Sequence, residues 1–302
     1  MKKLHHVIAA IDFTPSCRNA LREAARRASL DGAVITAVHV MDEFLVHELK
    51  KALSTDQATI RADWLKRLQQ FTAESEVGAA VVNAEVRIGH PFTELVEACR
   101  AHGADLLVMG AKGSKNEPHR IGAIAAKCVR KAPVDVLVVR EDAQGPFKKI
   151  VTCVDFSENA AKAVQYALHV ARQDGASLDC LHVYQSALAM SLDYGGFAPS
   201  LPATIDPEAV ENWRKDLEAF LAPLTREASD VKVTPLIKER VNIREAILDH
   251  VNESGASLVV LGTRGKTGLR EMLIGTTAEK IVQNAPCSIL AVKPDGFLTA
   301  AD

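Results

Sequence analysis

Glycines and hydroxyl side chains in the C-terminal half of the sequence have the spacing of an anion-binding loop. Gly262-Thr263-Arg264-Gly265 is followed by nine residues and then by Gly275-Thr276-Thr277. Glycine lets a backbone approach a polyphosphate closely, and N–H groups at a turn or a helix start attract anions. The hydroxyls of Thr276 and Thr277 can donate hydrogen bonds, and Arg264 and Lys266 can add positive charge. We interpret the spacing as a phosphate site; the alternative is that the glycines only form turns and cap a helix.

Two aspartates stand where short apolar runs end, Asp12 after Val7–Ile11 and Asp155 after the run that begins at Ile150. A carboxylate at the end of a buried strand commonly accepts hydrogen bonds from ribose hydroxyls, and it can also act as a general base. We favour the binding role. His39 and His182 hold equivalent positions, and we expect packing and one hydrogen bond from them, because no partner has metal-ligand spacing.

The segment Gly265-Lys266-Thr267 resembles the end of a P-loop. A P-loop also needs a glycine five residues before Gly265, and the residue there is Val260. We therefore exclude the P-loop interpretation and the Mg²⁺-centred hydrolysis that it would imply.

The chain contains one pattern twice. The matching segments lie 143 to 153 positions apart and keep their order, which indicates two copies of one domain rather than a solenoid of short repeats. The matches are Asp12-Phe13-Thr14 with Asp155-Phe156-Ser157, Asp31-Gly32-Ala33 with Asp174-Gly175-Ala176, His39-Val40 with His182-Val183, Trp64 with Trp213, Gly110 with Gly262, and Ala132-Pro133 with Ala285-Pro286. The polar, turn-forming residues Gln144-Gly145-Pro146 mark the join, so we expect domains at 1–144 and 145–302.

Within one copy, apolar runs alternate with segments of helical periodicity. In the first copy we expect strands at 7–11, 34–40, 81–88, 106–109 and 136–139, and helices that start near Pro15, Ile60, Phe92 and Ile121. This alternation predicts an α/β fold: two tandem Rossmann-like domains, each a five-stranded, mostly parallel sheet in the order 3-2-1-4-5 flanked by helices. Such sheets bind ligands at the carboxyl ends of the strands, where Asp155 and Gly262 would face one cleft.

The motifs together resemble the universal stress protein family, in its nucleotide-binding branch and in tandem form. The resemblance rests on Val154-Asp155-Phe156-Ser157, on the Asp-Gly-Ala and His-Val passages, and on the glycine loop with the ending at 285–292, and it covers essentially the whole chain twice. It implies that ATP, with or without Mg²⁺, is held across the strand ends. Asp155 would contact the adenosine, Val183 would line the adenine pocket, and Gly262, Gly265, Gly275, Thr276 and Thr277 would hold the phosphates.

The first copy departs from this pattern. After Gly113 only eight residues precede Gly122, and Ala123 replaces the hydroxyl residue. We therefore expect ATP mainly in the C-terminal copy, although Asp12 and Val40 could keep an adenosine pocket in the first.

Composition limits the remaining possibilities. The 302 residues carry 38 acidic and 36 basic side chains, a net charge of −2, which offers no bulk attraction for nucleic acid. No apolar stretch reaches the length of a membrane span, and the N-terminal residues do not resemble a secretion signal. Six cysteines without a Cys-x-x-Cys pair favour free thiols in a cytoplasmic protein. We expect no metal site, although His5, His6 and His119 could bind zinc if they meet.

Three functions remain open from the sequence. The first is an ATP-binding, stress-response regulator without catalytic residues; the second is slow ATP hydrolysis; the third is a structural dimerisation module without nucleotide. We expect the two domains to pair within the chain through their fifth strands, and a homodimer and a regulatory protein partner remain possible. The connection at 185–207 is interpreted as a lid, a partner surface or a disordered excursion.

Overall fold

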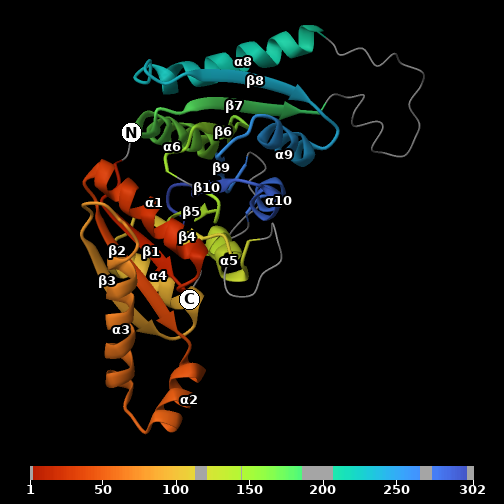
Figure 1. Cartoon of the computed structure of the whole chain (residues 1–302). Helices are drawn as coiled ribbons and strands as arrows, with labels where there is room; N and C mark the ends of the chain where they lie inside the picture. The colour runs from red at the N-terminus through yellow and green to blue at the C-terminus, as the bar shows by residue number, and fades with distance from the viewer. Residues whose placement is uncertain (1–2, 113–120, 144, 186–206, 266–273, 298–302) are drawn as a thin grey trace, which may run out of the picture. The chain divides into compact units, whose positions relative to one another are not determined.

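The structure, a computed structural model, describes residues 3–112, 121–143, 145–185, 207–265 and 274–297. Two compact units divide the chain (Figure 1). The first unit consists of 2–145 together with 288–302, and the second of 146–287. The connection at 186–206, the loop segments 113–120 and 266–273, and His119 and Lys266 with them, lie outside the described residues.

The first unit contains strands alternating with helices, as the sequence predicts. Its parallel strands are hydrogen-bonded in the order β3-β2-β1-β4-β5. The elements are β1 (His6–Ile11), α1 (Pro15–Asp31), β2 (Val34–Met41), α2 (Glu43–Leu53), α3 (Gln57–Ala73), β3 (Val82–Ile88), α4 (Pro91–Ala101), β4 (Leu106–Gly110), α5 (Ala123–Lys131) and β5 (Asp135–Val139). The helix α1 begins as expected, with Thr14 as its N-cap and Pro15 in its first turn.

The second unit repeats this order with four parallel strands, β8-β7-β6-β9. Its elements are β6 (Lys149–Cys153), α6 (Glu158–Asp174), β7 (Ser177–Tyr184), α8 (Pro207–Thr225), β8 (Val233–Glu239), α9 (Ile243–Glu253), β9 (Leu258–Gly262) and α10 (Thr276–Asn284). Helix α6 packs against β6 and β9 and also contacts α8, whereas α9 and α10 contact each other. The strands β6 and β9 are almost completely buried, as expected for a parallel sheet covered on both faces.

The second unit contains four of the five strands predicted for it, because the fifth strand of the second copy lies in the first unit. This strand, β10 (Ser288–Val292), belongs to the first unit, where it pairs antiparallel with β5. Side chains support the pairing: the Ser288 hydroxyl accepts from the Arg140 N–H at 3.1 Å, and the Asp135 carboxylate accepts from the Lys293 N–H at 2.7 Å. The compact units therefore differ from the sequence repeats by one strand, β10. The predicted bounds 1–144 and 145–302 describe the repeats, and as domain bounds they stay a prediction.

Candidate functional site

A cavity of about 340 Å³ lies at the carboxyl ends of β6, β7 and β9, closed on one side by the start of α10. This is the edge at which open parallel sheets bind ligands. Every residue that the sequence analysis predicted for the site lines this cavity: Asp155, Val183, Gly262, Arg264, Gly265, Gly275, Thr276 and Thr277. The structure thus brings together side chains that are up to 122 positions apart, counted from Asp155 to Thr277.

The Asp155 carboxylate is oriented by the turn that follows β6. Its Oδ1 accepts from the Ser157 N–H at 3.1 Å and from the Ser157 hydroxyl at 2.6 Å. Between them, Phe156 adopts a φ of 61°, the left-handed region that an aromatic residue rarely enters. The carboxylate therefore faces the cavity on a turn that its neighbours hold in place.

Gly262 has a packing role that the sequence interpretation missed. A Cβ atom on this residue would lie 2.7 Å from Nδ2 of Asn159, a side chain near the start of α6. Gly110 holds the equivalent place in the first unit, where a Cβ would lie 2.7 Å from the Ser16 hydroxyl. Close approach of strand and helix therefore explains this glycine in both units, and its presence alone says nothing about phosphate.

The described residues place no such constraint on Gly275. Its φ of −58° and ψ of 142° suit any residue, and among the described residues, which leave out 266–273, a Cβ would meet only the Thr263 carbonyl oxygen, at 4.0 Å. Gly275 is the N-cap of α10 and forms no side-chain cap, so the helix start presents backbone N–H groups beside the hydroxyl residues Thr276 and Thr277. The open space at this residue suits a close-lying anion.

Residues beyond the predicted set complete the cavity wall. His182 lines it, and its Nδ1 donates to the Val154 carbonyl oxygen at 2.7 Å, which agrees with the packing role expected for this histidine. Its ring contacts Trp213 at 4.9 Å between centroids. Ile243 and Ile247 of α9 form an apolar side that we did not predict. Their four-residue spacing at a helix start was the only signal available, and it is common to many core helices.

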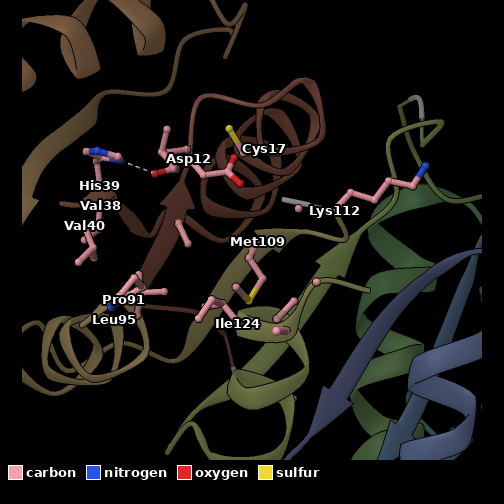
Figure 2. Close-up of a pocket in the computed structure, with 16 residues that line it drawn as sticks. Asp12, Cys17, Val38, His39, Val40, Pro91, Leu95, Met109, Lys112 and Ile124 are labelled. Atoms are coloured by element: carbon pink, nitrogen blue, oxygen red, sulfur yellow. Dashed lines mark hydrogen bonds between the residues drawn. The ribbon is translucent and has the colours of Figure 1, made fainter. Parts of the chain in front are cut away.

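The first unit has an equivalent cavity, also of about 340 Å³ (Figure 2). Asp12, His39, Val40 and Gly110 line it in the places of Asp155, His182, Val183 and Gly262. Gly122 and Ala123 lie at its other side, at the start of α5. Gly113, the second glycine of this loop, lies outside the described residues.

The thiols near the two cavities are not activated nucleophiles. Burial and, to a smaller extent, the neighbouring Asp155 carboxylate raise the pKa of Cys153 to about 12. The pKa of Cys17 is raised to about 12 by burial and by Asp12. Since a thiolate is the reactive form of cysteine, both side chains stay protonated and unreactive near neutral pH.

Metal ligands do not cluster in the part of the chain that the structure describes, where no group of three or more His, Cys, Asp and Glu side chains could hold an ion. The alternative set of three histidines weighed for zinc included His119, which lies outside this part. The described helices also include none that is both long and apolar enough to cross a lipid bilayer.

Comparison with known proteins agrees with the fold and with the duplication. The model of the universal stress protein family matches residues 3–140 and again 146–293. Universal stress protein YxiE of Bacillus subtilis is 30% identical over 147 residues, which are 49% of this chain and 99% of that protein. A universal stress protein of Mycolicibacterium smegmatis is 26% identical over 95% of this chain and 97% of its own length.

A crystal structure supports the same fold. The universal stress protein of Archaeoglobus fulgidus aligns with a TM-score of 0.63 at 17% identity, covering 95% of this chain and 98% of that one. The duplicated parallel sheets with ligand-sized cavities at their strand ends define a tandem α/β protein. With the family model matched twice, this chain belongs to the universal stress protein family, and its two copies are two domains of that family.

Proposed function

We propose that this protein binds one ATP in the cavity of its second unit and acts as a stress-response regulator in the cytoplasm. The observation that carries the proposal is the convergence of eight predicted residues on one cavity, with open space at Gly275. A cavity of about 340 Å³ lies in the size range of small-molecule sites. The six cysteines are all free thiols, which favours a reducing compartment.

Each side chain has a role that its position supports. Asp155 would accept hydrogen bonds from ribose hydroxyls, and Val183 would pack against the adenine ring. The start of α10 with its two threonines, together with Arg264 and Gly265, would bind the phosphates through N–H groups, hydroxyls and charge. Bound ATP supplies a polyphosphate that can carry Mg²⁺ with it, since this ion prefers phosphate oxygens and water to an all-protein cage.

A regulatory role follows from what surrounds this site. Asp155 is the only carboxylate among the described residues that line the cavity, so this part of its wall holds no pair of acidic groups that could activate water. Binding energy would instead favour one conformation or one protein partner, to the extent that ATP binds the two states unequally. Hydrolysis measured on the purified chain, with and without Mg²⁺, separates this role from slow catalysis.

Titration calorimetry of the full chain with ATP tests the binding site. We expect one site per chain, and we expect Gly275→Val to abolish it, because the valine side chain would fill the space beside the α10 start. The matched control is Gly122→Val, the equivalent change in the first unit, which should leave ATP affinity nearly unchanged. Two equivalent ATP sites, or a binding loss caused by Gly122→Val, would contradict the proposal.

A second pair of variants tests the ribose contact. Asp155→Ala should weaken ATP binding by about tenfold or more, since a hydrogen bond to a charged group contributes about 1.5–3 kcal/mol. Asp12→Ala should have little effect on ATP affinity. Circular dichroism of both variants checks that the fold is retained.

A further inference from the structure

The two cavities have the same volume and are lined by equivalent residues at the same strand ends. Each has a volume of about 340 Å³ and places an aspartate, a histidine and a valine at the same strand ends. In the first unit the Asp12 carboxylate is fixed like Asp155, because its Oδ1 accepts from the Thr14 N–H at 3.1 Å and from the Thr14 hydroxyl at 2.6 Å. The features proposed to bind ribose and adenine are therefore present twice.

The walls opposite the aspartates differ. Where the second cavity has the hydroxyl side chains Thr276 and Thr277 at the start of α10, the first has Ala123 and Ile124 at the start of α5. Figure 2 shows Ile124 together with Met109 and Leu95 around the lower part of the first cavity. An apolar side chain that replaces a hydroxyl removes a donor from a phosphate oxygen and offers a surface to an uncharged ring instead.

Among the described residues that line the first cavity, the charges also disfavour an anion. Lys112, the one lysine or arginine in this described part of the wall, lies with its Nζ 3.9 Å from the Glu141 carboxylate, so part of its charge is already matched. Cys17, which stands beside Asp12 in Figure 2, has a pKa raised to about 12 and remains a neutral thiol. The Asp12 carboxylate thus lies in a largely apolar cavity, where a second negative charge would be repelled.

We propose that the cavity of the first unit binds a nucleoside without phosphate groups, with adenosine as its simplest example. This proposal rests on the proposed function, because it assigns Asp12 and Val40 the roles of Asp155 and Val183. Asp12 accepts hydrogen bonds from the ribose hydroxyls, and the base packs against the apolar wall that includes Leu95, Met109 and Ile124. The chain then senses a nucleoside and its triphosphate through separate cavities.

The chain offers a separate reporter for each cavity. It has two tryptophans, one in each unit. Trp64 stacks on His39 at 4.9 Å between ring centroids and an interplanar angle of 13°, and His39 lines the first cavity. Trp213 contacts His182 of the second cavity at the same centroid distance, 4.9 Å, with the two rings tilted by 43°. Occupancy of either cavity can therefore be followed in a full-length chain that keeps one tryptophan.

The experiment uses the full chain with Trp213→Phe and follows Trp64 fluorescence during titration with adenosine and with ATP. We expect saturable adenosine binding, and ATP binding to this cavity that is at least tenfold weaker. Asp12→Asn should weaken adenosine binding at least tenfold, because it removes the charge but keeps an oxygen for Thr14. Asp155→Asn, the matched control, should leave adenosine binding at this cavity unchanged.

Two further measurements cover the cases in which Trp64 fluorescence does not respond or the Asp12→Asn variant does not fold. Equilibrium dialysis with labelled adenosine detects binding that leaves Trp64 fluorescence unchanged, and Val40→Phe fills the cavity if Asp12→Asn fails to fold. The proposal is overturned if the chain takes up no more adenosine than Val40→Phe does, or if ATP competes equally well. ATP binding followed at Trp213 in the Trp64→Phe chain tests the proposed function independently, so either idea can fail alone.

Discussion

The phenylalanine after each cavity aspartate carries an unusual backbone conformation in both units. Phe13 has a φ of 63° and Phe156 a φ of 61°, and glycine is the residue that normally occupies this region. Each ring packs in an aromatic cluster, Phe156 with His182 at 4.6 Å and Phe13 with His39 at 4.7 Å between centroids. The ring contacts stabilise the turn that directs the neighbouring carboxylate into its cavity, and strain of this kind is concentrated at functional sites.

Two glycines of the second cavity should respond in opposite ways to the same change. Gly262→Ala should destabilise the second unit by about 1–3 kcal/mol, because the added methyl would overlap Asn159. Gly275→Ala should change stability much less, since its backbone angles suit alanine and the described residues around it leave room. Urea unfolding followed at Trp213 measures both. Equal losses of stability in the two variants would show that Gly275 also has a packing role.

At the residue scale, the sequence predicted which side chains line the site but not why each is there. Spacing identified Gly262 and Gly275 together, although Gly262 permits close packing and the described residues around Gly275 leave open space. A spacing pattern has no information on what lies opposite a glycine, because that neighbour, Asn159, is more than 100 positions away in the sequence. His182 was predicted to pack, and its hydrogen bond to Val154 agrees with this.

At the element scale, the helices that pack into the core were predicted and the largely exposed helix α2 was not. Helix α3 was predicted from Ile60, Leu68 and Phe71, which are buried. Helix α2 was missed although Leu45, Leu49 and Leu53 have helical spacing. Only Val46 of this helix is buried, and its Phe44 and Leu45 are exposed. The strands were predicted well because a parallel sheet buries both of their faces.

The pairing of β5 with β10 depends on a buried lysine. Lys293 is 2% exposed; its ammonium group donates to the Val129 carbonyl oxygen in the last turn of α5 and lies 4.7 Å from the Phe297 ring centre. A cation at a helix C-terminus is favoured by the helix dipole.

Lys293→Ala should therefore destabilise the first unit by about 1.5–3 kcal/mol, the range for hydrogen bonds to charged groups. Amide hydrogen exchange should accelerate along β5 and β10 and much less along β1. An unchanged exchange rate at Val138, which pairs with Ile289, would contradict this role.

Two histidines, His6 on β1 and His39 on β2, allow a prediction of how the stability of the first unit depends on pH. Burial lowers the pKa of His39, and it also lowers the pKa of His6, to which the nearby His102 contributes. A histidine with a lowered pKa binds a proton more readily in the unfolded chain, so stability falls as the pH drops below about 6.5.

Between pH 7.5 and 5.5 the urea midpoint reported by Trp64 should therefore fall, and His39→Gln should reduce the fall. His47→Gln, at an exposed position of α2, serves as the control. If the midpoint of His39→Gln falls as steeply as that of the unmodified chain, His39 does not cause the dependence.

At the scale of the whole molecule, duplication allows the two domains to diverge. One copy keeps hydroxyl side chains at its cavity and the other has apolar ones, while the sheets and the aspartates remain alike. Such divergence is typical of function carried by sites on a shared fold.

The fifth strands of the two repeats, β5 and β10, are paired in this chain, whereas a single compact particle formed by the two units stays a prediction. We expect small-angle X-ray scattering to give the radius of gyration of one compact particle, about 19 Å for a chain of this length. Two lobes that move independently would give a clearly larger radius and a flexible profile. A concentration series would show whether chains also associate into dimers.

The place of β10 has a consequence for the order in which the protein is made. The N–H of Arg140, beside β5, can donate its hydrogen bond to the Ser288 hydroxyl only after Ser288, 148 positions later in the chain, has been synthesised. At a synthesis rate of about 5–20 residues per second, the ribosome needs about 7–30 s to reach it. During this time β5 is an unpaired sheet edge on a nascent chain, the kind of surface that chaperones shield and that neighbouring chains on a polysome can join.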